Sequence, residues 1–331
     1  MTTPTPPTPP SEPAVPSEPS MPSEPPSPDP ALSAIMSERR QLTNLAYRLL
    51  GTLTDAEDVV QETYARWYAM SRPQQEAIEN PAAWLTRVAG RICLDVLGSA
   101  RARRERYVGE WIPEPVPDST EWITGRPGGT ASPGPADPAD QITLDESISM
   151  AFLIVLESMT PAERVAFVLH DVFRYPFAEV AEIVGRTPAA CRQLASSARR
   201  RIRAARPAEP TPARQADLVR EFKRAWQAQD INALIGLLDP DATAIADGGG
   251  VVSALARPIV GGERIARRMI DITGLVADVT FLERTVNGRP GLVAQRDGVT
   301  VVVVAFGITD DRISDIWAVL NPGKLQPWIT G

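Results

Sequence analysis

The sequence predicts a multidomain protein in which two all-α domains precede an α+β domain. Apolar residues recur at helical spacing over residues 31–109 and again over 141–206. Over residues 213–331, further helical patterns are followed by short β-branched segments that turn residues separate. Proline-rich stretches divide these parts, and such stretches cannot bury a core of their own.

Residues 1–30 are expected to form a disordered tail. They contain 13 of the 33 prolines, four acidic residues and no lysine or arginine. This segment lacks the basic start and apolar centre of a signal peptide. The chain contains no run of about 18 apolar residues, so no membrane partner is expected. Its two isolated cysteines favour a reducing, cytoplasmic location.

The first helical domain, residues 31–109, is expected to contain three helices. The first ends at Gly51. Thr54, with Glu57 three residues later, predicts the N-cap and capping box of the second. Asn80-Pro81 begins the third helix, which runs to about Ala102 in an arginine-rich segment.

Residues 110–140 predict an acidic linker that is loosely ordered. Eight acidic residues face a single arginine between Glu110 and Glu146, which gives this stretch a charge of −7. Trp111 and Trp122 interrupt it, and a pure spacer has no need of such aromatic residues. The linker could hold the basic parts of the chain closed, or it could serve only as a soluble spacer.

The sequence over residues 141–206 predicts a second helical domain that contains a helix-turn-helix. A short helix over 177–184 is closed by Gly185, and Thr187-Pro188 begins the last helix with an N-cap and a proline at the first helical position. Residues 161–206 carry nine arginines against four acids, a charge of +5. This balance favours a nucleic-acid partner.

The last helix of this domain has the residues of a major-groove reader. Arg192 and Gln193 match guanine and adenine edges, and the later arginines match phosphate. The alternative is a solvated basic face. The expected DNA contacts are Thr187, Arg192, Gln193, Ser196, Arg199, Arg200 and Arg203.

Two other helices carry weaker signals. The third helix combines an aromatic residue with basic residues, which suits melted or duplex DNA; the alternative is a core tryptophan with surface arginines. The acidic start of the second helix suits a basic partner or a solvated face. The expected DNA contacts on the third helix are Trp84, Arg87, Arg91, Arg101, Arg103 and Arg104.

Over residues 213–331 the pattern predicts an α+β cone. Asn287-Gly288 is a hairpin signal between β-branched segments. All five tyrosines, the single histidine and both cysteines lie outside this domain, which weighs against an isomerase site. Asp247 stands beside three glycines, so we expect it in an exposed turn. Helices are expected over 214–238 and 262–271, and strands over 277–286, 291–296, 299–308 and 312–320.

These residues carry a resemblance to the sigma-70 family. Asp55–Glu62 resembles the helix of the second conserved region that binds core RNA polymerase. Asn80–Ala89 resembles the segment that melts and reads the −10 element, and Leu169–Ala181 with the arginine-rich helix resembles the region that reads the −35 element. The presence of only these two regions resembles the domain layout of the extracytoplasmic-function (ECF) group. The resemblance implies polymerase contacts at Asp55, Glu57, Asp58, Val60, Gln61 and Glu62.

The resemblance extends to a subgroup with a fused SnoaL-like, NTF2-fold extension. Two signatures of that subgroup stand at 247–251 and 321–325, with Val251 and Gly323 in place of a lysine and an aspartate. The resemblance implies that the extension regulates the helical domains in cis. The residues implied are Trp111, Pro113, Glu114, Pro115, Asp247, Gly248, Gly249, Gly250, Asn321, Pro322, Lys324 and Leu325.

We therefore expect a sigma factor that binds core RNA polymerase and promoter DNA, without catalysis and without a cofactor. Two other classes remain open. A polymerase-independent helix-turn-helix repressor would use only 141–206, and a fused isomerase or sensor would take an unknown small ligand in the C-terminal domain.

Overall fold

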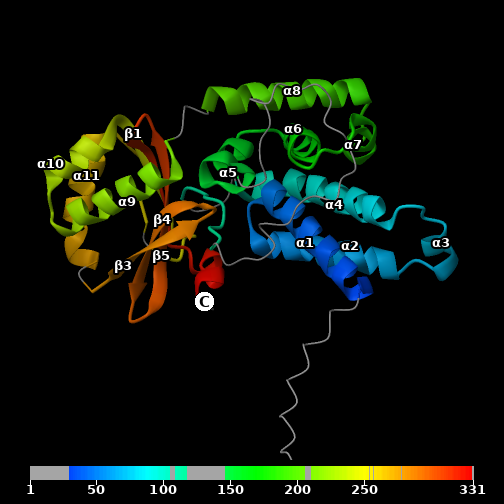
Figure 1. The fold of residues 1–331 in the computed structure, drawn as a ribbon, viewed down its shortest axis with the longest axis horizontal. Coiled ribbons are helices and arrows are strands. Elements are labelled where there is room, and N and C mark those ends of the chain that lie inside the picture. Colours follow the sequence, from blue (N-terminus) through cyan, green and yellow to red (C-terminus); the bar gives the residue numbers. More distant parts are fainter. Residues whose placement is uncertain are drawn as a thin grey trace, which may run out of the picture.

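The computed structural model describes residues 30–104, 109–117, 146–205, 210–252, 254–255, 257–276 and 278–329. The two helical domains lie side by side, and the sheet-containing domain lies against one end of the pair (Figure 1). Within these ranges no helix has the length and apolar character needed to cross a bilayer. The N-terminal tail and most of the acidic linker fall outside them.

The first helical domain contains α1 (Pro30–Leu50), α2 (Leu53–Tyr68), α3 (Arg72–Glu76) and α4 (Pro81–Arg104). Gly51 ends α1 in a left-handed conformation at φ 79°. The predicted N-cap at Thr54 is wrong, because Thr52 is the residue that caps α2, accepting a hydrogen bond from Asp55 N at 3.3 Å. The abrupt end of α1 leaves Thr52 extended, so α2 begins before Thr54.

The second helical domain contains the turn η2 (Glu146–Ile148), α5 (Met150–Glu157), α6 (Pro161–Phe167), the π-helical turn η3 (Val168–Val172), α7 (Phe177–Val184) and α8 (Pro188–Ala205). Gly185 closes α7 at φ 69°, and Thr187 Oγ1 accepts from Ala190 N at 3.2 Å to cap α8. The predicted helix-turn-helix is confirmed as α7 and α8.

The two helical domains share one apolar core. Buried side chains from α1, α2 and α4 form a single cluster with those of α5 to α8. The contact is closest where α4 passes α7, because Gly90 has no side chain: a Cβ there would lie 2.9 Å from Ile183 Cγ2. The helices can approach this closely only with glycine at position 90.

The C-terminal domain is an α+β cone, as predicted. Its helices are α9 (Pro212–Gln227), α10 (Ile231–Leu237) and α11 (Gly262–Asp271), and its short helical turns are η4 (Thr273–Val276), η5 (Pro322–Lys324) and η6 (Gln326–Trp328). The six-stranded sheet has the order β2-β1-β6-β5-β4-β3, with only the β1–β6 pair parallel. Its strands are β1 (Leu238–Asp247), β2 (Ile259–Val260), β3 (Thr280–Val286), β4 (Arg289–Arg296), β5 (Val299–Thr309) and β6 (Arg312–Val319).

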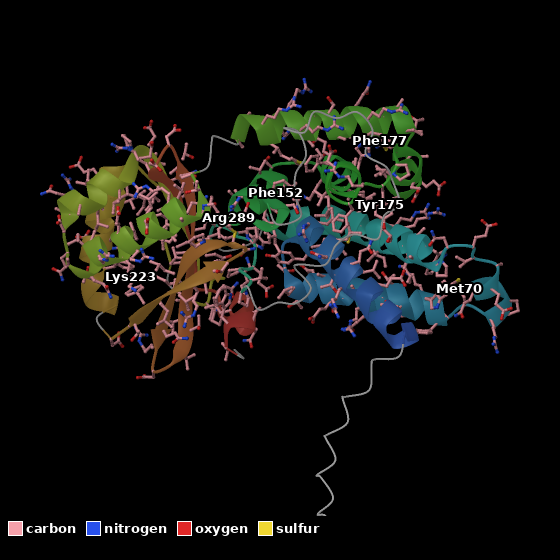
Figure 2. All side chains as sticks on the ribbon, in the orientation of Figure 1. Met70, Phe152, Tyr175, Phe177, Lys223 and Arg289 are labelled. Carbon is pink, nitrogen blue, oxygen red and sulfur yellow. The ribbon has the colours of Figure 1, made fainter. Side chains whose placement is uncertain are left out.

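The sheet is covered on both faces. The helices of the cone pack on one face around Phe222 and Trp226. The other face, with Val303 and Trp317, packs against Ile112 of the linker and Met150 of α5. This second face brings the C-terminal domain into contact with the rest of the chain. Phe152 and Arg289 mark the junction in Figure 2.

The predicted hairpin at Asn287-Gly288 is confirmed. The two residues have φ of 52° and 72° and join β3 to β4. A second turn of the same form, Asp297-Gly298 at φ 51° and 78°, joins β4 to β5. The two turns lie at opposite ends of β4.

Candidate polymerase and promoter interfaces

The acidic face of α2 points to solvent. Glu57, Asp58, Gln61 and Glu62 are exposed and Asp55 is half-buried. Glu62 makes an exposed ion pair with Arg66 at 2.8 Å. Val60 is a correction: its side chain is 2% exposed and belongs to the core, so it does not contribute to this surface. An apolar residue between acidic ones packs inward because the helix turns it to the opposite side.

On α4, two of the residues expected at the −10 element, Arg87 and Arg91, are engaged by the second helical domain. Arg87 forms an ion pair with Glu182 of α7 at 2.9 Å, and Arg91 donates to Glu182 O at 2.9 Å. Trp84 is half-buried and packs edge-on against Trp67, with ring centroids 5.3 Å apart. Arg101, Arg103 and Arg104 lie on the helix, but their side chains fall outside the described residues.

Tyr175 adds a third contact between the helical domains, at the junction labelled in Figure 2. Its hydroxyl lies 2.9 Å from Thr86 Oγ1 on α4 and accepts from Gln41 Nε2 on α1 at 3.3 Å. The preceding residue, Arg174, adopts a left-handed φ of 63°, which is strained for a residue with a side chain. This turn directs the chain back toward the first helical domain.

Among the described residues, the outward face of α8 is exposed to solvent. Arg192, Gln193, Ser196, Arg200 and Arg203 are exposed, and Thr187 caps the helix. Arg199 differs from expectation in being half-buried and paired with Asp171 of η3 at 2.7 Å. The Arg192 guanidinium lies 5.7 Å from the ring centroid of Phe177, the first residue of α7.

Asp247 is buried, at 1% exposure, so the expected exposed turn is wrong. Lys324 Nζ lies 2.6 Å from Asp247 Oδ2 and donates to Ile112 O at 2.5 Å. Ile112 N donates to the same carboxylate oxygen at 3.1 Å. The ammonium also lies 4.3 Å from the Trp111 ring centroid. These contacts join the linker to both signatures of the C-terminal domain.

The glycine run beside Asp247 accommodates the second signature. A Cβ on Gly249, which has φ of 65°, would lie 2.5 Å from the side chain of Asn321, so only glycine fits. Gly248 and Gly250 complete the turn. Asn321 Oδ1 accepts from Gly323 N at 3.0 Å, with Pro322 exposed between them and Leu325 buried after them. Val251 is 78% exposed, so the position of the missing lysine faces solvent.

Residues 109–117 differ from the expected loose linker, because their backbone bonds to the first helical domain and to the C-terminal domain. Pro113 and Pro115 are buried, and Trp328 Nε1 donates to Pro115 O at 2.8 Å. Glu114 N donates to Gly51 O at 2.8 Å, and its carboxylate accepts from Leu53 N at 2.8 Å. Glu114 therefore caps α2 rather than facing the arginines of α8.

Burial gives this linker contact a pH dependence. Burial raises the pKa of Glu114 from 4.5 to about 7, although the Leu53 N–H opposes the shift. The folded state thus holds the proton of this carboxyl group more tightly than the unfolded chain does. The contribution of Glu114 to stability is therefore fully present below pH 4.5 and is lost as pH rises toward 7. We expect Glu114→Gln to stabilise the chain at pH 8 by about 1–3 kcal/mol and to flatten this pH dependence.

The measurement is the urea midpoint at pH 5 and pH 8. Glu110→Gln, four residues earlier and without the Leu53 contact, is the matched control and should show the same difference in midpoint between pH 5 and pH 8 as the unmodified chain. The same difference in Glu114→Gln would contradict the assignment.

Several contact residues carried no recognisable signal in the sequence. Glu182 and Tyr175 act across the helical domains, Asp171 pairs with Arg199 within the second one, and Tyr47 donates to Glu114 O at 2.7 Å. Asn287 was identified only as a turn residue. Such partners lie far apart in the chain, so local spacing could not have indicated them.

Two protein-family models match the two helical domains. The family model for Sigma-70 region 2 matches residues 34–104, and the model for Sigma-70 region 4 matches residues 149–202. These segments contain α2, α4 and the helix-turn-helix.

Similar proteins cover nearly the whole chain. The chain is 36% identical to ECF RNA polymerase sigma factor SigJ of Mycobacterium tuberculosis, over 86% of this chain and 90% of that protein. It is 35% identical to the probable sigma factor SigI of the same species, over 90% and 96%. The crystal structure of SigJ superposes with a TM-score of 0.68 at 32% identity, over 89% and 98%. The chain therefore belongs to the ECF RNA polymerase sigma factors, which bind RNA polymerase and promoter DNA to direct transcription initiation.

Proposed function

We propose that this sigma factor is held in a closed form by its own linker and C-terminal domain until core polymerase separates the helical domains. In the open form, the acidic face of α2 would bind polymerase, α4 would contact the −10 element and α8 the −35 element. Sigma factors contact DNA elements that are well separated along a promoter, whereas here α4 and α7 are packed together.

The observation that carries this proposal is the engagement of Arg87 and Arg91 by Glu182. Two side chains expected to contact DNA are bound by the other helical domain. The ion pair alone is partly exposed and contributes little, so the shared apolar core supplies most of the closure.

The C-terminal domain supports a regulatory rather than a catalytic role. Its cone is filled by aromatic side chains: Phe222 packs on Phe306 at 5.4 Å between centroids, and Trp226 on Phe281 at 4.6 Å. The small ligand stays a prediction. A cleft of about 450 Å³ lies instead between α5, α8 and the sheet, with Met150, Ile202 and Asp315 among its lining residues.

A disulfide across α4 and α7 tests the closed state. A Cβ on Gly90 would lie 3.9 Å from Ile183 Cβ, which suits a disulfide. We expect the oxidised Gly90→Cys/Ile183→Cys variant to lose promoter-directed run-off transcription with core polymerase by at least about tenfold, the equivalent of 1.4 kcal/mol. Reduction should restore it.

The reduced form of the same variant and the single Ile183→Cys variant are the controls. Equal transcription from oxidised and reduced protein would show that the closed arrangement is compatible with initiation, and the proposal would be wrong.

A further inference from the structure

The tip of the β3–β4 hairpin lies where the linker and both helical domains meet. Asn287 is 0% exposed. Its Nδ2 donates to Tyr47 Oη on α1 at 2.8 Å and to Ile148 O, just before α5, at 3.0 Å. Its Oδ1 accepts from Val116 N at 3.1 Å, and its backbone N donates to Val116 O at 2.9 Å.

The chemistry of this position fits asparagine. The carboxamide supplies two donors and one acceptor at the end of a short side chain, and each is used here. An aspartate would lack both donors and would bring a charge into a buried site. Asparagine also tolerates the left-handed φ of 52° that the turn requires.

The contact continues beyond Asn287. Tyr47 Oη, which accepts from Asn287, donates to Glu114 O at 2.7 Å, and Glu114 in turn bonds to Gly51 and Leu53. Val286, at the end of β3, forms a bridge with Pro117. One hairpin tip is thus tied to α1, to the start of α2 through the linker, and to the segment that leads into α5.

We infer that Asn287 is a positioning residue that couples the C-terminal domain to the separation of the two helical domains. The inference rests on the proposed closed state. The Lys324–Asp247 pair fixes the C-terminal domain to the linker, whereas Asn287 also reaches both helical domains. When the helical domains separate, Tyr47 and Ile148 cannot both keep their hydrogen bonds to one carboxamide. These bonds therefore oppose the separation, and the orientation of the hairpin depends on whether the helical domains are closed or open.

The second hairpin provides a matched control. Asp297-Gly298 has the same turn form at φ 51° and 78°, but it is exposed at the other end of β4. Glycine suits the left-handed conformation at either turn. Asn287→Gly and Asp297→Gly therefore make the same backbone change, and only the first removes the contacts between domains.

The test is hydrogen exchange on the full chain, followed by run-off transcription. In Asn287→Gly we expect the amides of Glu114 and Val116 to exchange about tenfold faster or more, since exchange reports local opening. Asp297→Gly should leave both rates unchanged. We also expect promoter-directed transcription with core polymerase to change at least about threefold in Asn287→Gly alone, which corresponds to at least about 0.6 kcal/mol.

Tyr47→Phe is the second variant, in case Asn287→Gly folds poorly. It keeps the buried ring and removes only the hydroxyl, so it should accelerate exchange at the same amides to a smaller extent.

The outcomes separate this inference from the proposal on which it rests. Unchanged exchange in both variants would overturn it. So would faster exchange with unchanged transcription, provided that the oxidised Gly90→Cys/Ile183→Cys protein is inactive. If the oxidised protein is active, the closed state itself is wrong.

Discussion

Replacing Lys324 with methionine is expected to destabilise the full chain by about 3–5 kcal/mol, because it leaves the Asp247 carboxylate buried without its ammonium partner. Ile112 O would lose its donor in the same step. The double variant Lys324→Met/Asp247→Asn should recover much of this loss, since it removes both charges together. Urea unfolding followed by tryptophan fluorescence measures the effect.

The only other lysine in the chain gives the matched control. Lys223 pairs with Glu283 at 2.8 Å on the surface, with side chains 21% and 38% exposed. Lys223→Met should cost no more than about 1 kcal/mol. Equal effects from the two lysine variants, or no recovery in the double variant, would contradict the view that burial makes the Lys324–Asp247 pair important.

Charge reversal at Arg192 is expected to abolish promoter selectivity while leaving polymerase binding intact. The side chain is exposed at the start of α8, where a major-groove helix contacts base edges. One base pair read by arginine contributes about 1–3 kcal/mol of discrimination, and a carboxylate also repels phosphate. We expect Arg192→Glu to lower promoter-specific transcription by at least about a hundredfold.

Arg224→Glu makes the same charge change at an exposed position on α9, away from the helix-turn-helix, and should retain transcription. Binding to core polymerase is measured in parallel by gel filtration. Loss of both activities in Arg192→Glu would indicate misfolding, and retention of promoter specificity would contradict the assignment of α8.

Local signals in the sequence predicted the parts of the fold that local forces determine. Gly185, Thr187 and the Asn287-Gly288 turn act within a few residues of themselves, and the structure has them as predicted. Strand β1 was missed because Leu238–Asp247 contains three alanines, three aspartates and a proline, residues that are uncommon in strands. Pairing with β6, far along the chain, makes it a strand.

The interface residues show the same limit. Three glycines beside Asp247 indicated an exposed turn, but its partner Lys324 lies 77 residues away and keeps it buried. The hairpin signal gave the conformation of Asn287 and nothing about its three partners. Helical spacing placed Arg87 and Arg91 on one helix, whereas their engagement by Glu182 depends on how two separate domains pack.

The single core shared by the two helical domains has a consequence for ionic strength. Contacts between apolar side chains are not screened by salt, whereas contacts between arginines and phosphate weaken steeply as salt rises. Added salt should therefore leave the helical domains packed together while it releases DNA from α8. A titration with sodium chloride can thus vary promoter binding with little change in the conformation of the free protein.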